Sequence, residues 1–98
     1  MITLYHRTGS DIAKSVVATG FQDGDGYFMT NIHHAGVWFA DRPLDSNEGA
    51  YGGALICVRV EESEIERFEW IEEGKTYREW LIPARVINLL GPITILDE

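Results

Sequence analysis

The sequence has few of the features typical of secreted, membrane-spanning or disulfide-stabilised proteins. Its 98 residues include one cysteine, Cys57, so no disulfide can form within the chain. No apolar run approaches the ~20 residues of a membrane-spanning helix, and no cationic start followed by a long apolar segment is present. We expect no membrane association, a reducing cytoplasmic location and a buried, inert thiol at Cys57.

Basic residues are also scarce, with 8 Lys and Arg against 16 Asp and Glu and a formal net charge of −8. This charge repels phosphate backbones and anionic lipid surfaces, which argues against non-specific binding to nucleic acids or membranes. A small anionic ligand stays compatible with it, since such a ligand needs only a local set of donors. The acidic run over residues 61–66 is expected to be a solvated turn or short helix.

Length and hydrophobic patterning predict a single α+β domain over residues 1–98 with more sheet than helix. A chain of this size buries roughly two-thirds of its unfolded surface, enough for one core without a structural metal. A first strand should end near Arg7. One clear helix then runs from Asp11 to a glycine C-cap at Gly20, with Thr8 and Ser10 offering capping hydroxyls. Further strands are predicted over residues 27–29, 36–41, 54–60, 68–71, 78–82, 86–90 and 93–96.

Three residues at strand ends could carry chemistry: His6, Trp38 and Glu79. Taken singly, each has an ordinary structural interpretation: a hydrogen-bonded strand histidine, a core tryptophan, and, for Glu79 beside Arg78, a solvated or ion-paired surface carboxylate. Exposed ion pairs of that kind contribute only ~0 to 1 kcal/mol. Spacing alone does not show that the three side chains meet.

The short sequence motifs around these residues, taken in their order along the chain, are more specific than any of the three residues alone. They are residues 4–8 (LYHRT), a helix ending in Gly20, and residues 36–41 (GVWFAD), 53–58 (GALICV) and 78–82 (REWLI). Over nearly the whole chain this order resembles the ADP-ribosyltransferase superfamily. It is most similar to the poly(ADP-ribose) polymerase and diphtheria-toxin branch, whose signature is histidine, tyrosine and glutamate. The resemblance implies a small split β-sheet domain with one helix after the first strand.

The resemblance also implies a site for NAD, which is the substrate. His6 would hydrogen-bond a ribose, and the backbone of Arg7 would hold the nicotinamide carboxamide. Thr8 would support this carboxamide-binding part of the site. Trp38 would place its ring against the nicotinamide, and Gly36 would allow close approach.

Glu79 matches the catalytic glutamate of the family. Loss of nicotinamide generates an oxocarbenium-like ribosyl cation, which an ionised carboxylate stabilises electrostatically. This chemistry needs no metal and no covalent enzyme nucleophile. We therefore expect mono-ADP-ribosylation of an unknown acceptor, which is a protein, a nucleic acid or a small molecule, as in a bacterial or phage effector or toxin.

The sequence departs from the family pattern at several positions. Arg7 replaces the usual glycine after the histidine, and Trp38 replaces the usual tyrosine. The second stacking aromatic has Tyr51 as its nearest candidate. Tyr77 stands two residues before Glu79, where arginine-modifying relatives carry glutamate or glutamine, so an arginine acceptor is not predicted. The short stretch between residues 60 and 77 leaves little room for an acceptor-recognition loop.

Other functions stay open at this point. Arg7 and the absent second aromatic are compatible with a non-catalytic module that binds NAD, ADP-ribose or a protein. Plain NAD hydrolysis is a further enzymatic possibility. The adjacent His33 and His34 resemble a histidine-containing motif of the RNA 2′-phosphotransferase branch of the superfamily, although the acidic net charge counts against RNA binding. These two histidines point to opposite strand faces, so no metal site is expected.

Overall fold

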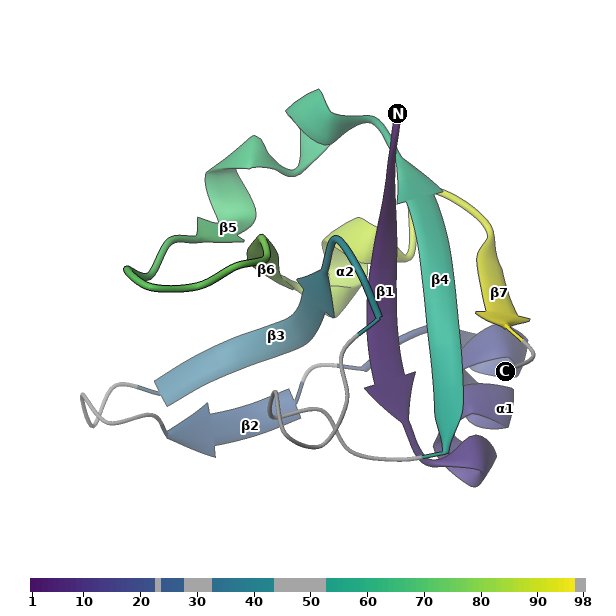
Figure 1. The fold of residues 1–98 in the computed structure, drawn as a ribbon. Coiled ribbons are helices and arrows are strands. Elements are labelled where there is room, and N and C mark those ends of the chain that lie inside the picture. Colours follow the sequence, from purple (N-terminus) through teal and green to yellow (C-terminus); the bar gives the residue numbers. More distant parts are fainter. Residues whose placement is uncertain (23, 28–32, 44–52, 97–98) are drawn as a thin grey trace.

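The computed structural model describes residues 1–22, 24–27, 33–43 and 53–96. It contains one antiparallel sheet with the strand order β5-β6-β3-β1-β4-β7, and β2 pairs with β3 beside this path (Figure 1). The strands are β1 (Ile2–Thr8), β2 (Gly24–Tyr27), β3 (His33–Ala40), β4 (Ala54–Val60), β5 (Glu69–Trp70), β6 (Glu79–Ile82) and β7 (Ile93–Leu96). The helices are α1 (Ser10–Thr19), α2 (Ala84–Ile87) and two 3₁₀ turns, η2 (Glu62–Glu64) and η3 (Glu66–Phe68). The predicted α+β class is confirmed.

Helix α1 follows β1 as the sequence predicts, but its N-terminus is built differently. Strand β1 continues to Thr8, so the extended residue Gly9 becomes the N-cap, and no side chain caps the helix. The predicted capping by Thr8 or Ser10 is therefore wrong. The C-terminus agrees with the sequence, since Gly20 adopts a φ of 91° and donates its backbone N–H to the Val16 carbonyl oxygen at 2.7 Å.

Residues 86–90 do not form the predicted strand. Helix α2 ends at Ile87 and a turn follows over residues 88–90. The first turn of α2 closes on the Pro83 carbonyl, which accepts the N–H groups of Val86 and Ile87 at 2.9 and 3.1 Å. Ala84 and Ile87, three positions apart, are both buried. A short apolar run fits a buried strand or a buried helical turn equally well, and here tertiary packing selected the helix.

The sheet has one face that the helices cover, and Figure 1 shows α1 and α2 on the same side of it. We call this the helix face, and its strand residues are Leu4, His6, Val37, Phe39, Ile56, Val58, Trp80 and Ile82. Trp80 and Phe39 are its largest buried side chains, and Ala13 and Val16 of α1 complete the core beside them.

Alternate residues of the same strands point to the other side of the sheet, which we call the second face. It carries Tyr5, Arg7, Trp38, Ala40, Cys57 and Glu79. Cys57 is free and only partly buried, so the expected full burial of its thiol is not found. The helix face is therefore an apolar core, whereas the second face combines charged and aromatic groups with apolar residues such as Leu55 and Leu81.

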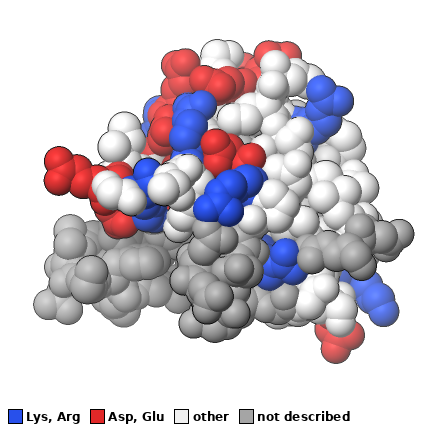
Figure 2. Space-filling model, in the orientation of Figure 1, with Lys and Arg blue, Asp and Glu red and all other residues white. Residues whose placement is uncertain are grey.

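The acidic run predicted to be solvated forms the exposed 3₁₀ turns η2 and η3. Glu61, Glu62, Glu64 and Glu66 are all exposed. Figure 2 shows red side chains gathered at the top of the molecule, where these turns lie. No helix within the described part of the chain is long and apolar enough to cross a membrane.

Candidate functional site

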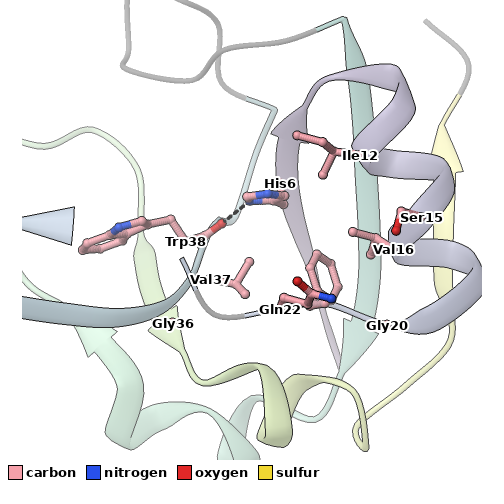
Figure 3. A pocket seen from close by; sticks show the side chains of 10 residues that line it. His6, Ile12, Ser15, Val16, Gly20, Gln22, Gly36, Val37 and Trp38 are labelled. Atoms are coloured by element: carbon pink, nitrogen blue, oxygen red, sulfur yellow. Dashed lines mark hydrogen bonds between the residues drawn. The ribbon is translucent and has the colours of Figure 1, made fainter. Parts of the chain in front are cut away.

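A pocket of about 470 Å³ opens on the helix face between α1 and the β1–β3 junction (Figure 3). This volume lies within the range of about 300–1,000 Å³ that is usual for small-molecule sites. Its walls are mostly apolar and combine one histidine with a few small or polar groups. The lining residues are His6, Ile12, Ser15, Val16, Gly20, Phe21, Gln22, Gly36, Val37 and Trp38.

The His6 imidazole is fixed in the pocket wall by one hydrogen bond and two aromatic neighbours. Its Nδ1–H donates to the Trp38 carbonyl oxygen at 2.7 Å. The rings of Phe21 and Phe39 lie 5.8 and 5.7 Å from the imidazole centroid. Burial lowers the pKa of His6, and the bond to the Trp38 carbonyl offsets only part of that effect. The ring is thus neutral at neutral pH, with Nδ1 protonated and Nε2 left as a hydrogen-bond acceptor.

Asn88 holds the segment that forms the floor of this pocket. Its side-chain oxygen accepts the Phe21 backbone N–H at 2.8 Å, and its amide nitrogen donates to the Phe21 carbonyl oxygen at 3.0 Å. Gly20, directly before Phe21, packs against the same side chain. The residue just after α2 therefore fixes the position of the chain that leaves α1.

Trp38 contributes to both faces of the sheet. Its carbonyl oxygen points toward His6, whereas its indole ring points away from the pocket (Figure 3). On the second face this ring meets Trp70 of β5 edge to face, with 5.4 Å between the ring centroids. The ring predicted to stack on nicotinamide therefore belongs to a second group of residues rather than to the wall around His6.

Glu79 lies in that second group. It stands opposite Ala40 in the β3–β6 ladder and opposite Trp70 in the β5–β6 ladder, and residues opposite one another share a face. Ala40 also stands opposite Tyr5, so His6, the next residue of β1, points to the other side of the sheet. Glu79 is absent from the pocket lining, and its carboxylate pairs with the Lys75 ammonium.

Arg78 is not the ion-pair partner of Glu79, because neighbouring strand residues point in opposite directions. Its Nε and Nη2 donate to the two carboxylate oxygens of Glu69 at 3.0 and 2.8 Å, and Nη1 lies 3.3 Å from Glu62. These bonds hold the pKa of Glu69 below its ordinary value. The guanidinium also lies 4.8 Å from the Trp80 ring centroid. Glu79 therefore pairs with the loop residue Lys75 and not with the adjacent Arg78.

The structure places the other predicted site residues as follows. Arg7 stands opposite Leu55 on the second face, while Thr8, opposite Ala54 at the end of β1, shares the face of His6. Gly36 lines the pocket with a φ of 148°, and a Cβ there would lie 3.1 Å from Leu81. Its lack of a side chain thus lets β3 approach β6. Tyr51 lies outside the described residues.

Three residues in these two groups were not singled out from the sequence: Phe21, Trp70 and Lys75. Phe21 follows the predicted glycine C-cap at Gly20, a position where an apolar residue is ordinary and gives no sign of a site. Trp70 could have been found from the turn signal at Gly74, since a hairpin centred there puts residue 70 opposite residue 79. Lys75 stands four residues before Glu79, but it lies in the loop between β5 and β6 and in no helix, so its contact depends on the loop conformation.

Comparison with known proteins adds no relative, since no family model, curated protein or solved structure matches this chain. The resemblance to ADP-ribosyltransferases therefore stays a prediction from the short sequence motifs alone. The described residues contain no group of three or more His, Cys, Asp or Glu that could hold a metal ion. His33 and His34 form the start of β3.

Proposed function

We propose that this protein is an NAD-dependent mono-ADP-ribosyltransferase. One observation carries the proposal: the strands of the three motif residues are neighbours in the order β6-β3-β1, and Trp38 on the middle strand connects the other two. Its carbonyl accepts the hydrogen bond from His6, and its ring shares the face of Glu79. The side chains of His6 and Glu79 themselves point to opposite faces of the sheet, so Trp38 is the motif residue that neighbours both.

Each residue has a group suited to its proposed role. The neutral His6 imidazole has Nε2 as an acceptor for a ribose hydroxyl. Trp38 and Trp70 provide flat apolar rings for the nicotinamide. The Glu79 carboxylate would stabilise the positive charge that develops on the ribose as nicotinamide leaves. Arg7, on the same face as Glu79, would face the diphosphate.

Incubation of the protein with labelled NAD in a cell lysate tests the proposal. We expect release of nicotinamide and label on an acceptor, with both lost in Glu79→Gln while NAD binding persists. Glu73→Gln is the matched control, because it makes the same change at an exposed position of the preceding loop. Nicotinamide release without a labelled acceptor would identify a glycohydrolase. No turnover with lysate proteins, nucleic acids or NAD alone would remove the catalytic proposal.

A non-catalytic module that binds NAD or ADP-ribose is the second candidate. It is favoured by one observation: Lys75 already neutralises the Glu79 carboxylate, on the face opposite His6. Calorimetric titration with NAD, ADP-ribose and nicotinamide separates the two functions. Binding with no nicotinamide release favours the module, and slow release that requires Glu79 favours the enzyme.

A further inference from the structure

Lys75 lies in a cage formed by two carboxylates and one aromatic ring. Its ammonium bonds Oε2 of Glu79 and lies 3.5 Å from Oε2 of Glu72. The same nitrogen lies 5.2 Å from the centroid of the Tyr77 ring. Glu72, Lys75 and Tyr77 belong to the turn from β5 to β6, and Glu79 is the first residue of β6, so the β5–β6 hairpin builds the cage.

The two carboxylates differ in how strongly they are shielded from water. The side chains of Lys75 and Glu79 are 22% and 15% exposed, whereas that of Glu72 is 56% exposed. A shielded ion pair is screened less than an exposed one, so Lys75 interacts mainly with Glu79. Burial lowers the pKa of Lys75, but the bond to Glu79 and the negative charges of Glu79 and Glu72 raise it by more. Lys75 is therefore a permanent cation at this position.

The contact uses only one of the two Glu79 oxygens. Lys75 bonds Oε2, and within the described part of the chain no hydrogen bond reaches Oε1. A carboxylate held at one oxygen has a fixed plane, and its other oxygen has a defined direction. That second oxygen is the one left for a substrate hydroxyl.

Other charges near the Lys75–Glu79 pair are arranged around Tyr77. The Arg42 guanidinium lies 5.1 Å from the centroid of the Tyr77 ring, so a cation from the end of β3 and Lys75 from the loop both contact this ring. Trp70, opposite Glu79 on β5, adds an apolar neighbour. Arg78 and Glu69 form a separate pair, since Arg78 points away from the face of Glu79.

We propose that Lys75 is a positioning residue that holds the Glu79 carboxylate by one oxygen and directs the other toward the ribose of NAD. This inference depends on the proposed function and names a residue that the motif comparison did not supply. Lys75 touches neither the substrate nor the reacting atoms in this scheme, and it acts only through Glu79.

The experiment compares nicotinamide release by the wild type, Lys75→Met, Lys75→Arg and the control Lys14→Met. Lys14 is an exposed residue of α1, so the control removes an equal charge far from the hairpin. We expect Lys75→Met to lower kcat roughly 10- to 100-fold, as misplaced catalytic groups do, with KM changed less than about twofold. Lys75→Arg should recover most of the turnover, and Lys14→Met should match the wild type.

A second readout does not require activity. Urea unfolding of the wild type, Lys75→Met, Glu79→Gln and the double variant forms a cycle that measures the coupling of the pair. We expect the double variant to lose less stability than the sum of the single losses. Lys75→Gln replaces the methionine variant if the latter does not fold.

The two proposals fail in different ways. An active wild type whose turnover is unchanged by Lys75→Met, or an additive cycle, would overturn the role of Lys75 and leave the enzymatic function standing. A raised KM with an unchanged kcat in Lys75→Met would also overturn the role of Lys75, because the lysine would then contact NAD directly. A wild type that releases no nicotinamide removes both proposals.

Discussion

The imidazole of His6 is bonded to the backbone of Trp38, a residue 32 positions later in the chain. The 2.7 Å contact joins β1 and β3 just beyond Tyr5 and Ala40, where the two strands are in register. One residue thus carries the acceptor for His6 on one face and an indole ring on the other. This relationship connects the pocket on the helix face to the Glu79 group on the second face.

The pH dependence of folding should report on His6. Its pKa in the folded protein lies below the ordinary value of about 6.5, so the unfolded chain binds more protons as pH falls past that value. The free energy of unfolding should therefore decrease as the pH falls from 7.5 to 5.5, and His6 should contribute at most about 1.4 kcal/mol of this decrease per pH unit. Urea unfolding of the wild type and of His6→Phe across this pH range measures the contribution of His6. Parallel curves for the two proteins would contradict this assignment.

Removing the Asn88 side chain should loosen the floor of the pocket. Asn88→Ala deletes both bonds to the Phe21 backbone and should cost about 1–2 kcal/mol of stability. Asn88→Asp keeps an acceptor for the Phe21 N–H but cannot donate to the Phe21 carbonyl, so its loss should be intermediate at most. Hydrogen exchange at Phe21 provides the direct measurement. Equal exchange in all three proteins would exclude Asn88 as the clamp.

Gly36→Ala should be much more harmful than the same change at Gly53. The φ of 148° at Gly36 is strained for any residue with a Cβ, and that atom would lie 3.1 Å from Leu81 and 3.2 Å from the Ile82 carbonyl oxygen. We expect a loss of about 1–3 kcal/mol. A Cβ at Gly53 meets nothing within 4 Å, which makes it the control. Similar thermal unfolding of both variants would show that β3 and β6 adjust freely.

The two indole rings of the second face should matter for NAD binding. Trp38→Ala removes the proposed nicotinamide platform and its edge-to-face contact with Trp70, a contact of about 0.5–1.5 kcal/mol. We expect NAD affinity to fall by about tenfold or more, while Trp38→Phe retains most of it. Titration calorimetry measures both. An unchanged affinity in Trp38→Ala would place the nicotinamide elsewhere, with the pocket around His6 as the next position to test.

Much of the fold could be predicted because its signals are local. The spacing of Ala13 and Val16, with a glycine cap after them, predicted α1. The β-branched run over residues 54–60 predicted β4 with the same bounds that the structure has. The run over residues 86–90 was misassigned because composition does not separate a short buried helix from a strand, and only the packing of Ile87 into the core decided it.

The candidate site was less predictable because it depends on strand register. The alternation along β1 shows that Tyr5 and His6 point to opposite faces, and the sequence alone contains that fact. It does not contain the pairing of Tyr5 with Ala40 or of Ala40 with Glu79, which puts Glu79 on the face away from His6. Pairing of strands far apart in sequence is fixed by burial of the whole sheet face, so a local pattern cannot specify it.

The sequence by itself determined the class of fold, the position of α1 and the order of the motif residues along the chain. Tertiary structure alone decided that His6 bonds the Trp38 backbone and that Glu79 pairs with Lys75 instead of Arg78. The physical reason is that helix periodicity and strand alternation act between near neighbours, whereas side chains of different strands meet only after packing has set the register and the turn conformation.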